Sequence, residues 1–157
     1  MLSCEIDVIN KVIITFSLPR SNMTITEETI SLPTPTGEMR TLISRPSATG
    51  RYAGIVLFSE IFQITGPIRR TAAWLAGHGY TVATPEIYHE LEPAGTVIPY
   101  DQAGAEKGNA DKIAKEISSY DADARAALDH LASRPDASGS LGVMGSASEA
   151  IWPFARQ

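Results

Sequence analysis

The chain has 157 residues, of which 43% are hydrophobic, 20% charged and 7% aromatic, and its formal net charge at pH 7 is -5. This composition is typical of an ordinary globular domain and excludes collagen, low-complexity disorder and a membrane-spanning protein. Because 18 Asp and Glu residues outnumber 13 Lys and Arg residues, the chain lacks the basic character of a nucleic-acid-binding protein. We therefore expect neither nucleic acid nor a membrane among its partners.

Residues 1–22 contain one apolar run, at positions 12–18, which is far shorter than the roughly 20 residues that a membrane helix needs. They show neither the basic start nor the cleavage site of a secretory signal. The single cysteine, Cys4, cannot form an internal disulfide, which suits a reducing compartment. We therefore expect a cytoplasmic protein in which residues 1–22 are a poorly ordered upstream extension and translation begins at Met23 rather than at Met1.

Two short strands open the predicted fold. Residues 26–32 and 38–45 are rich in Thr and Ile, and the Pro-Thr-Pro-Thr-Gly stretch between them marks a turn, so we expect a hairpin. Residues 53–59 then form a continuous apolar run, AGIVLFS. This pattern is typical of a strand that is covered on both faces, as in a parallel sheet.

A helix is predicted to follow this strand. Thr65 can cap its start, Pro67 suits its first turn, and Gly77 can end it. Residues 80–84 are again apolar and predict the next buried strand.

After a predicted loop over residues 85–108, one apolar stripe continues at helical spacing over about five turns. This stripe predicts a single helix that begins at the capping residue Asn109 and ends before Pro135. Its members are Ile113, Ile117, Tyr120, Ala124, Ala127, Leu128 and Leu131. Residues 140–144 predict a last strand that ends at Gly145. The order of elements indicates one α/β domain with right-handed crossovers.

In an open α/β sheet, ligands bind beyond the carboxyl ends of the strands. Glu60, Tyr88 and His89 fall in such places, as does the segment that follows Gly145, so these residues are candidates for a functional site. No glycine-rich phosphate loop follows a strand, and the three histidines lack the spacing of metal ligands. We therefore expect no cofactor and no metal.

Three motifs make residues 23–145 resemble the dienelactone hydrolase family of α/β-hydrolases. They are Glu60-Ile61-Phe62 after a strand, the helix in which Arg69 and Arg70 precede Trp74, and Pro85-Glu86-Ile87-Tyr88 after the next strand. The resemblance implies a partial α/β-hydrolase fold, with a mostly parallel sheet, an N-terminal hairpin, and C-terminal strands and helices missing. It also implies that an intact member is a monomer that hydrolyses small-molecule esters or lactones with a cysteine, a histidine and an aspartate, and without a cofactor.

In this family, the nucleophilic cysteine stands on a G-x-C-x-G-G turn, whose glycines let the backbone close without clashes. The resemblance implies that Glu60 controls the thiol, and that the backbone N–H of Ile61 is one of two donors that stabilise the oxyanion. The resemblance implies that the backbone N–H of Ser148 is the second donor.

Some members hold the carboxylate of an acidic dienelactone with an arginine near the position of His89 and Glu90, and because neither residue is such a cation, the resemblance does not predict an anionic dienelactone as substrate. Tyr88 and His89 are candidate substrate-binding residues because they follow the carboxyl end of a strand.

The sequence departs from this turn after Gly145. Ala147 stands at the nucleophile position and has neither a thiol nor a hydroxyl, while Glu149 and Ala150 replace the two glycines. When one base is restored after the codon for Gly145, synonymous codons for residues 146–157 can be chosen that read Phe-Cys-Ile-Gly-Gly-His and onward, which is the family turn. We therefore expect residues 146–157 to be an aberrant tail that a one-base deletion produced.

On this interpretation the chain is an inactive N-terminal part of a hydrolase, and the family's histidine and aspartate are expected beyond residue 157. The strand over residues 140–144 would then present an open apolar edge that favours aggregation. The alternative is a noncatalytic binding or regulatory module on a partial hydrolase fold, in which the tail is genuine. A flavodoxin-like domain fits less well, because of the opening hairpin and the missing phosphate loop.

Overall fold

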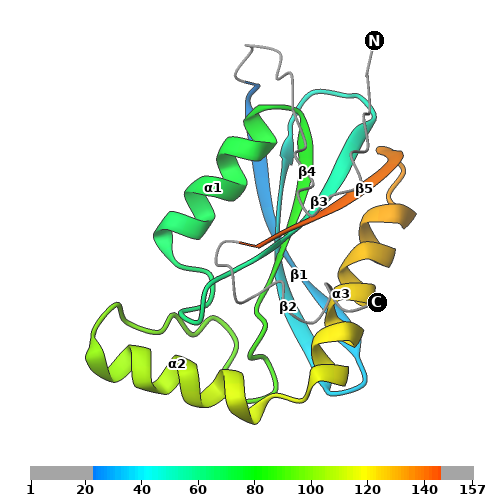
Figure 1. Ribbon diagram of the computed structural model, residues 1–157. Coiled ribbons are helices and arrows are strands. Elements are labelled where there is room, and N and C mark those ends of the chain that lie inside the picture. The colour runs from blue at the N-terminus through cyan, green and yellow to red at the C-terminus, as the bar shows by residue number, and fades with distance from the viewer. Residues whose placement is uncertain (1–22, 146–157) are drawn as a thin grey trace, which may run out of the picture.

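The computed structural model describes residues 23–145, which form a five-stranded sheet and three helices (Figure 1). In chain order the elements are β1 (Ile25–Thr34), β2 (Gly37–Pro46), β3 (Tyr52–Phe58), α1 (Gly66–Gly77), β4 (Tyr80–Pro85), α2 (Gln102–Ala114), α3 (Ile117–Ser133) and β5 (Ala137–Gly145). All five predicted strands and the first predicted helix are confirmed. The expected extension over residues 1–22 and the expected tail over residues 146–157 lie outside the described residues.

The strands of the sheet follow the order β1-β2-β4-β3-β5. β1 and β2 pair in antiparallel as the predicted hairpin, in which Thr34 lies opposite Gly37, and β2 is also antiparallel to β4. β3 is parallel to both β4 and β5. The sheet is therefore mixed, and the α/β fold with an N-terminal hairpin is confirmed. Its parallel part brings the carboxyl ends of three strands to one edge.

Helices cover both faces of the sheet, as Figure 1 shows for α1 and α3. Ile55 and Leu57 of β3 belong to the apolar cluster with α1, whereas Val56 and Phe58 belong to the cluster with α3. Neighbouring residues of a strand point to opposite faces. A strand that is buried on both sides needs apolar residues at every position, which explains the unbroken apolar run of β3.

The predicted single helix from Asn109 to Pro135 is wrong, because the structure contains two helices in this region. Lys115 and Glu116 have extended backbone conformations between α2 and α3. Ile113 and Ile117 flank this break and are 85% and 67% exposed, so neither belongs to the buried stripe. The stripe is confirmed only along α3, where Ala124, Ala127 and Leu131 are buried.

The predicted helix caps were only partly right. Thr65 does stand at the N-cap position of α1, but its side chain makes no capping hydrogen bond. Asp101, rather than Asn109, caps α2, since its side chain accepts a hydrogen bond of 2.7 Å from the N–H of Gly104. The predicted loop after β4 therefore ends at residue 101, and α2 begins there.

Most residues of β5 are exposed. Leu141, Val143 and Met144 are each more than 40% exposed, although β5 pairs with β3. Among residues 23–145, no helix combines the length and the apolar character that crossing a membrane requires.

Candidate active site

The carboxyl ends of β3, β4 and β5 lie at the same edge of the sheet, because the three strands run parallel. Phe58, the last residue of β3, is paired with Gly145, the last residue of β5. Ser59, Glu60 and Ile61 follow Phe58 in the chain, so their loop starts beside the point where the chain leaves β5. This edge is where an α/β sheet is expected to bind ligands. Ala147, at the predicted position of the lost nucleophile, and Ser148, the predicted second oxyanion donor, lie outside the described residues.

Glu60 is half-buried and has a defined partner. The hydroxyl of Tyr100 donates a hydrogen bond of 2.7 Å to its Oε2 atom. The same hydroxyl lies 3.0 Å from Oγ1 of Thr65, and the ring of Tyr100 packs against the ring of Phe62 with 4.4 Å between the centroids. Burial raises the pKa of Tyr100 above its ordinary value of 10.0; the hydrogen bond with Thr65 opposes this rise, and the Glu60 carboxylate adds to it. The phenol is therefore a neutral donor at pH 7.

The backbone of Ile61 lies in close contact with α2 through its carbonyl oxygen. A Cβ atom added to Gly108 of α2 would lie 2.5 Å from the carbonyl oxygen of Ile61, so only a glycine permits this close approach. Within residues 23–145, no acceptor takes up the N–H of Ile61. An unpaired backbone N–H at the carboxyl end of a strand is suited to stabilise a developing oxyanion.

Gln63 joins the loop after β3 to the loop after β4. Its side chain is buried, its Oε1 atom accepts a hydrogen bond of 3.3 Å from the N–H of Tyr88, and its Nε2 atom donates to the carbonyl oxygen of Thr96 at 3.4 Å. A further bond of 3.2 Å runs from the N–H of Ile98 to the carbonyl oxygen of Phe62. Gln63 itself has a φ angle of 65°, which is uncommon for a residue with a side chain. The two loops therefore form one unit.

Tyr88 and His89 point into the protein. Tyr88 is 1% exposed, and its hydroxyl donates to the carbonyl oxygen of Gly108 at 3.3 Å. Burial, followed by the effects of Tyr120 and Asp111, raises the pKa of Tyr88 far above the ordinary value. The Nε2 atom of His89 lies 3.1 Å from Oδ1 of Asp123, and both side chains are almost fully buried. Their contact with a substrate stays a prediction.

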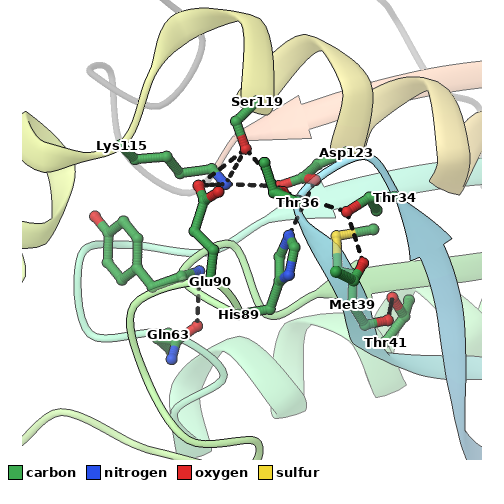
Figure 2. A network of polar contacts seen from close by, with 12 residues as sticks. Thr34, Thr36, Met39, Thr41, Gln63, His89, Glu90, Lys115, Ser119 and Asp123 are labelled. Carbon is green, nitrogen blue, oxygen red and sulfur yellow. Dashed lines mark hydrogen bonds and ion pairs between the residues drawn. The ribbon is translucent and has the colours of Figure 1, made fainter.

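A buried charged network lies behind His89, between the loop after β4 and the junction of α2 with α3 (Figure 2). Nζ of Lys115 is 2.5 Å from Oε1 of Glu90, 2.9 Å from Oδ2 of Asp123 and 2.7 Å from Oγ of Ser119. Burial tends to raise the pKa of Glu90, but hydrogen bonds from Lys115 and Ser119 lower it overall. The network fixes the loop that carries Tyr88 and His89.

Tyr100 and Gly108 are among the residues of this site that were not predicted. Tyr100 carries no local sequence signal, because its partner Glu60 is 40 positions away. Gly108 could have been found, since Gly104 and Gly108 are four residues apart and two glycines at this spacing indicate a helix face in close contact with its neighbour. Within the part of the chain that the structure describes, no group of three or more His, Cys, Asp or Glu side chains could hold a metal ion.

The sequence model of the Dienelactone hydrolase family matches residues 39–146. A carboxymethylenebutenolidase homologue of Saccharomyces cerevisiae is 37% identical over 122 residues, which are 74% of this chain and 44% of that protein. The carboxymethylenebutenolidase of Pseudomonas putida is 28% identical over 91 residues, which are 58% of this chain and 39% of that protein. The chain thus spans less than half the length of these curated relatives.

Solved structures of dienelactone hydrolases and related proteins share the fold of residues 23–145. A dienelactone hydrolase-like promiscuous phosphotriesterase from metagenomic libraries superimposes with a TM-score of 0.63 and 18% identity, over 84% of this chain and 54% of that chain. The dienelactone hydrolase of Anabaena variabilis gives a TM-score of 0.52 and 15% identity, over 79% of this chain and 53% of that chain. At these identities the likeness concerns the fold alone.

Proposed function

The chain belongs to the dienelactone hydrolase family, and we propose that residues 23–145 provide the N-terminal half of a site that hydrolyses small-molecule esters or lactones. One observation carries the proposal. The pairing of Phe58 with Gly145 starts the Glu60-Ile61 loop beside the chain that leaves β5, which is where the family turn G-x-C-x-G-G belongs. In this proposal, the carboxylate of Glu60 and the N–H of Ile61, which has no acceptor among residues 23–145, belong next to the nucleophile.

In the proposed site, Glu60 acts on the nucleophilic thiol through its carboxylate, and the N–H of Ile61 donates to the oxyanion of the tetrahedral intermediate. A donor of this kind is typically responsible for a factor of about 10²–10³ in rate. The N–H of Ser148, or of the residue that replaces it, would be the second donor. The half-burial of Glu60 and the unpaired N–H of Ile61 support these roles.

We further propose that the chain does not hydrolyse esters as it stands. Ala147 offers no nucleophilic atom, and Glu149 and Ala150 replace the glycines of the turn. The substituted turn thus lacks both the reacting sulfur and the residues that allow a strained backbone. A single lost base explains all three differences together, because restoring it permits the family turn to be read.

The inactivity is tested with p-nitrophenyl acetate. We expect the 157-residue protein to show no turnover above buffer, and the protein from the frame-corrected gene to hydrolyse the ester in a manner that depends on Glu60. Glu60→Ala should abolish this activity, whereas Glu106→Ala, which removes an exposed carboxylate of α2, should not. Saturable turnover by the 157-residue protein that Glu60→Ala abolishes would overturn the inactivity, and an inert frame-corrected protein would overturn the hydrolase site.

The origin of the tail is tested separately by sequencing the gene across the codons for Gly145 and Ser146 and beyond. We expect the frame that is shifted by one base to continue with a histidine and an aspartate suited to the family's catalysis. If the DNA encodes the tail without such a continuation, the tail is genuine. In that case the noncatalytic binding module is the better description.

A further inference from the structure

We infer that Tyr100 is the positioning residue for Glu60: its phenol fixes one oxygen of the carboxylate and leaves the other for the chemistry of the site. The inference rests on the proposed role of Glu60. It adds a residue from the loop after β4 to a function that was assigned to the loop after β3. Among the side-chain hydrogen bonds that join these two loops within residues 23–145, the one from Tyr100 to Glu60 is the shortest.

The hydrogen-bond pattern around this hydroxyl has a definite direction. A phenol has one proton to donate and can also accept, whereas an ionised carboxylate only accepts. The proton of Tyr100 therefore points to Oε2 of Glu60 at 2.7 Å, and the hydroxyl of Thr65 at 3.0 Å donates to the phenol oxygen. A hydrogen bond to an ionised carboxylate is stronger than one between neutral groups.

The ring of Tyr100 is held in place although 56% of the residue is exposed. It packs against Phe62 at a tilt of 48°, and the adjacent Asp101 caps α2. Thr65 on the other side stands at the N-cap of α1. Tyr100 thus lies between the first residues of two helices, which gives its hydroxyl a fixed position relative to Glu60.

This hydrogen bond holds the carboxylate of Glu60 in one orientation. Oε2 is occupied by Tyr100, while Oε1 has no hydrogen-bond partner among residues 23–145. An isolated surface glutamate samples several rotamers, and ordering it costs free energy. Because Tyr100 reduces this freedom in advance, Oε1 is held ready for the chemistry of the proposed site.

The test uses the 157-residue protein with ¹³C-labelled glutamate carboxyl groups and tyrosine rings, followed by NMR. Glu60→Gln identifies the resonance of Glu60, and Tyr100→Phe removes only the hydroxyl of Tyr100. We expect Tyr100→Phe to shift the carboxyl resonance of Glu60. The matched control is Tyr52→Phe, which removes a hydroxyl that donates to the carbonyl oxygen of Ala48 at 2.8 Å, and it should leave that resonance unchanged.

The reverse measurement does not depend on the fold of the Tyr100 variant. We expect Glu60→Gln to lower the pKa of Tyr100, because the negative charge that disfavours the phenolate is lost. An unchanged titration of Tyr100 in Glu60→Gln, or an unchanged Glu60 resonance in Tyr100→Phe, would overturn the inference. Both signals are independent of ester hydrolysis, so an inert frame-corrected protein would refute the proposed function and leave the contact with Tyr100 intact.

Discussion

Lys115→Met is expected to lower the free energy of unfolding by about 3–5 kcal/mol, because it leaves buried carboxylates without their cation. The side chains of Lys115 and Asp123 are both 0% exposed, and that of Glu90 is 17% exposed. Methionine fills a similar volume but offers neither a charge nor a hydrogen-bond donor. The loss should appear as a lower urea midpoint in unfolding followed by circular dichroism at 222 nm.

Lys107→Met is the matched control for this prediction. Lys107 also contacts two carboxylates, those of Glu92 and Asp111, but its side chain is 48% exposed. The side chains of Glu92 and Asp111 are only 12% and 8% exposed, but water can take the place of the exposed ammonium of Lys107, so this variant should be less destabilised than Lys115→Met. Equal losses in the two variants would show that the burial of the lysine side chain does not set the energy of these contacts.

This network also explains why the predicted single helix was wrong. Helical spacing from Ile113 onward is a local signal, and it continues across the break without interruption. The break brings Lys115 to Glu90, which is 25 positions earlier in the chain. A long-range pairing of this kind leaves no trace in local periodicity, and it overrides the continuous helix that the spacing favours.

The strands could be predicted because their signals are local. β3 is unbroken in its apolar character, since both faces are covered, and the hairpin of β1 and β2 is set by the Pro- and Gly-rich turn between them. The position of Glu60 at the end of β3 could also be predicted, because it depends only on where this strand ends. The partner of Glu60 could not be predicted, since Tyr100 comes from a loop whose path depends on tertiary contacts.

Gly108→Ala is expected to destabilise the protein by about 1–3 kcal/mol, because the added Cβ atom overpacks a tight contact. That atom would lie 2.5 Å from the carbonyl oxygen and 3.0 Å from the Cβ atom of Ile61. The carbonyl belongs to the backbone and cannot rotate away as a side chain does, so either α2 or the Ile61 loop must move. The amide resonance of Ile61 should therefore shift, together with the loss in urea unfolding.

Gly66→Ala separates this clash from the general effect of replacing a helical glycine. Gly66 begins α1, and the nearest atom to an added Cβ would be Nη1 of Arg70 at 3.4 Å, which is the flexible end of an exposed side chain. Alanine favours a helix over glycine, but a Cβ atom on the residue before Pro67 disfavours the helical conformation, so this variant should change in stability by less than about 1 kcal/mol. If Gly108→Ala changed stability as little as Gly66→Ala, α2 would not press on Ile61. The position of the Ile61 N–H would then have to be set by the bonds of Gln63 and Tyr100 alone.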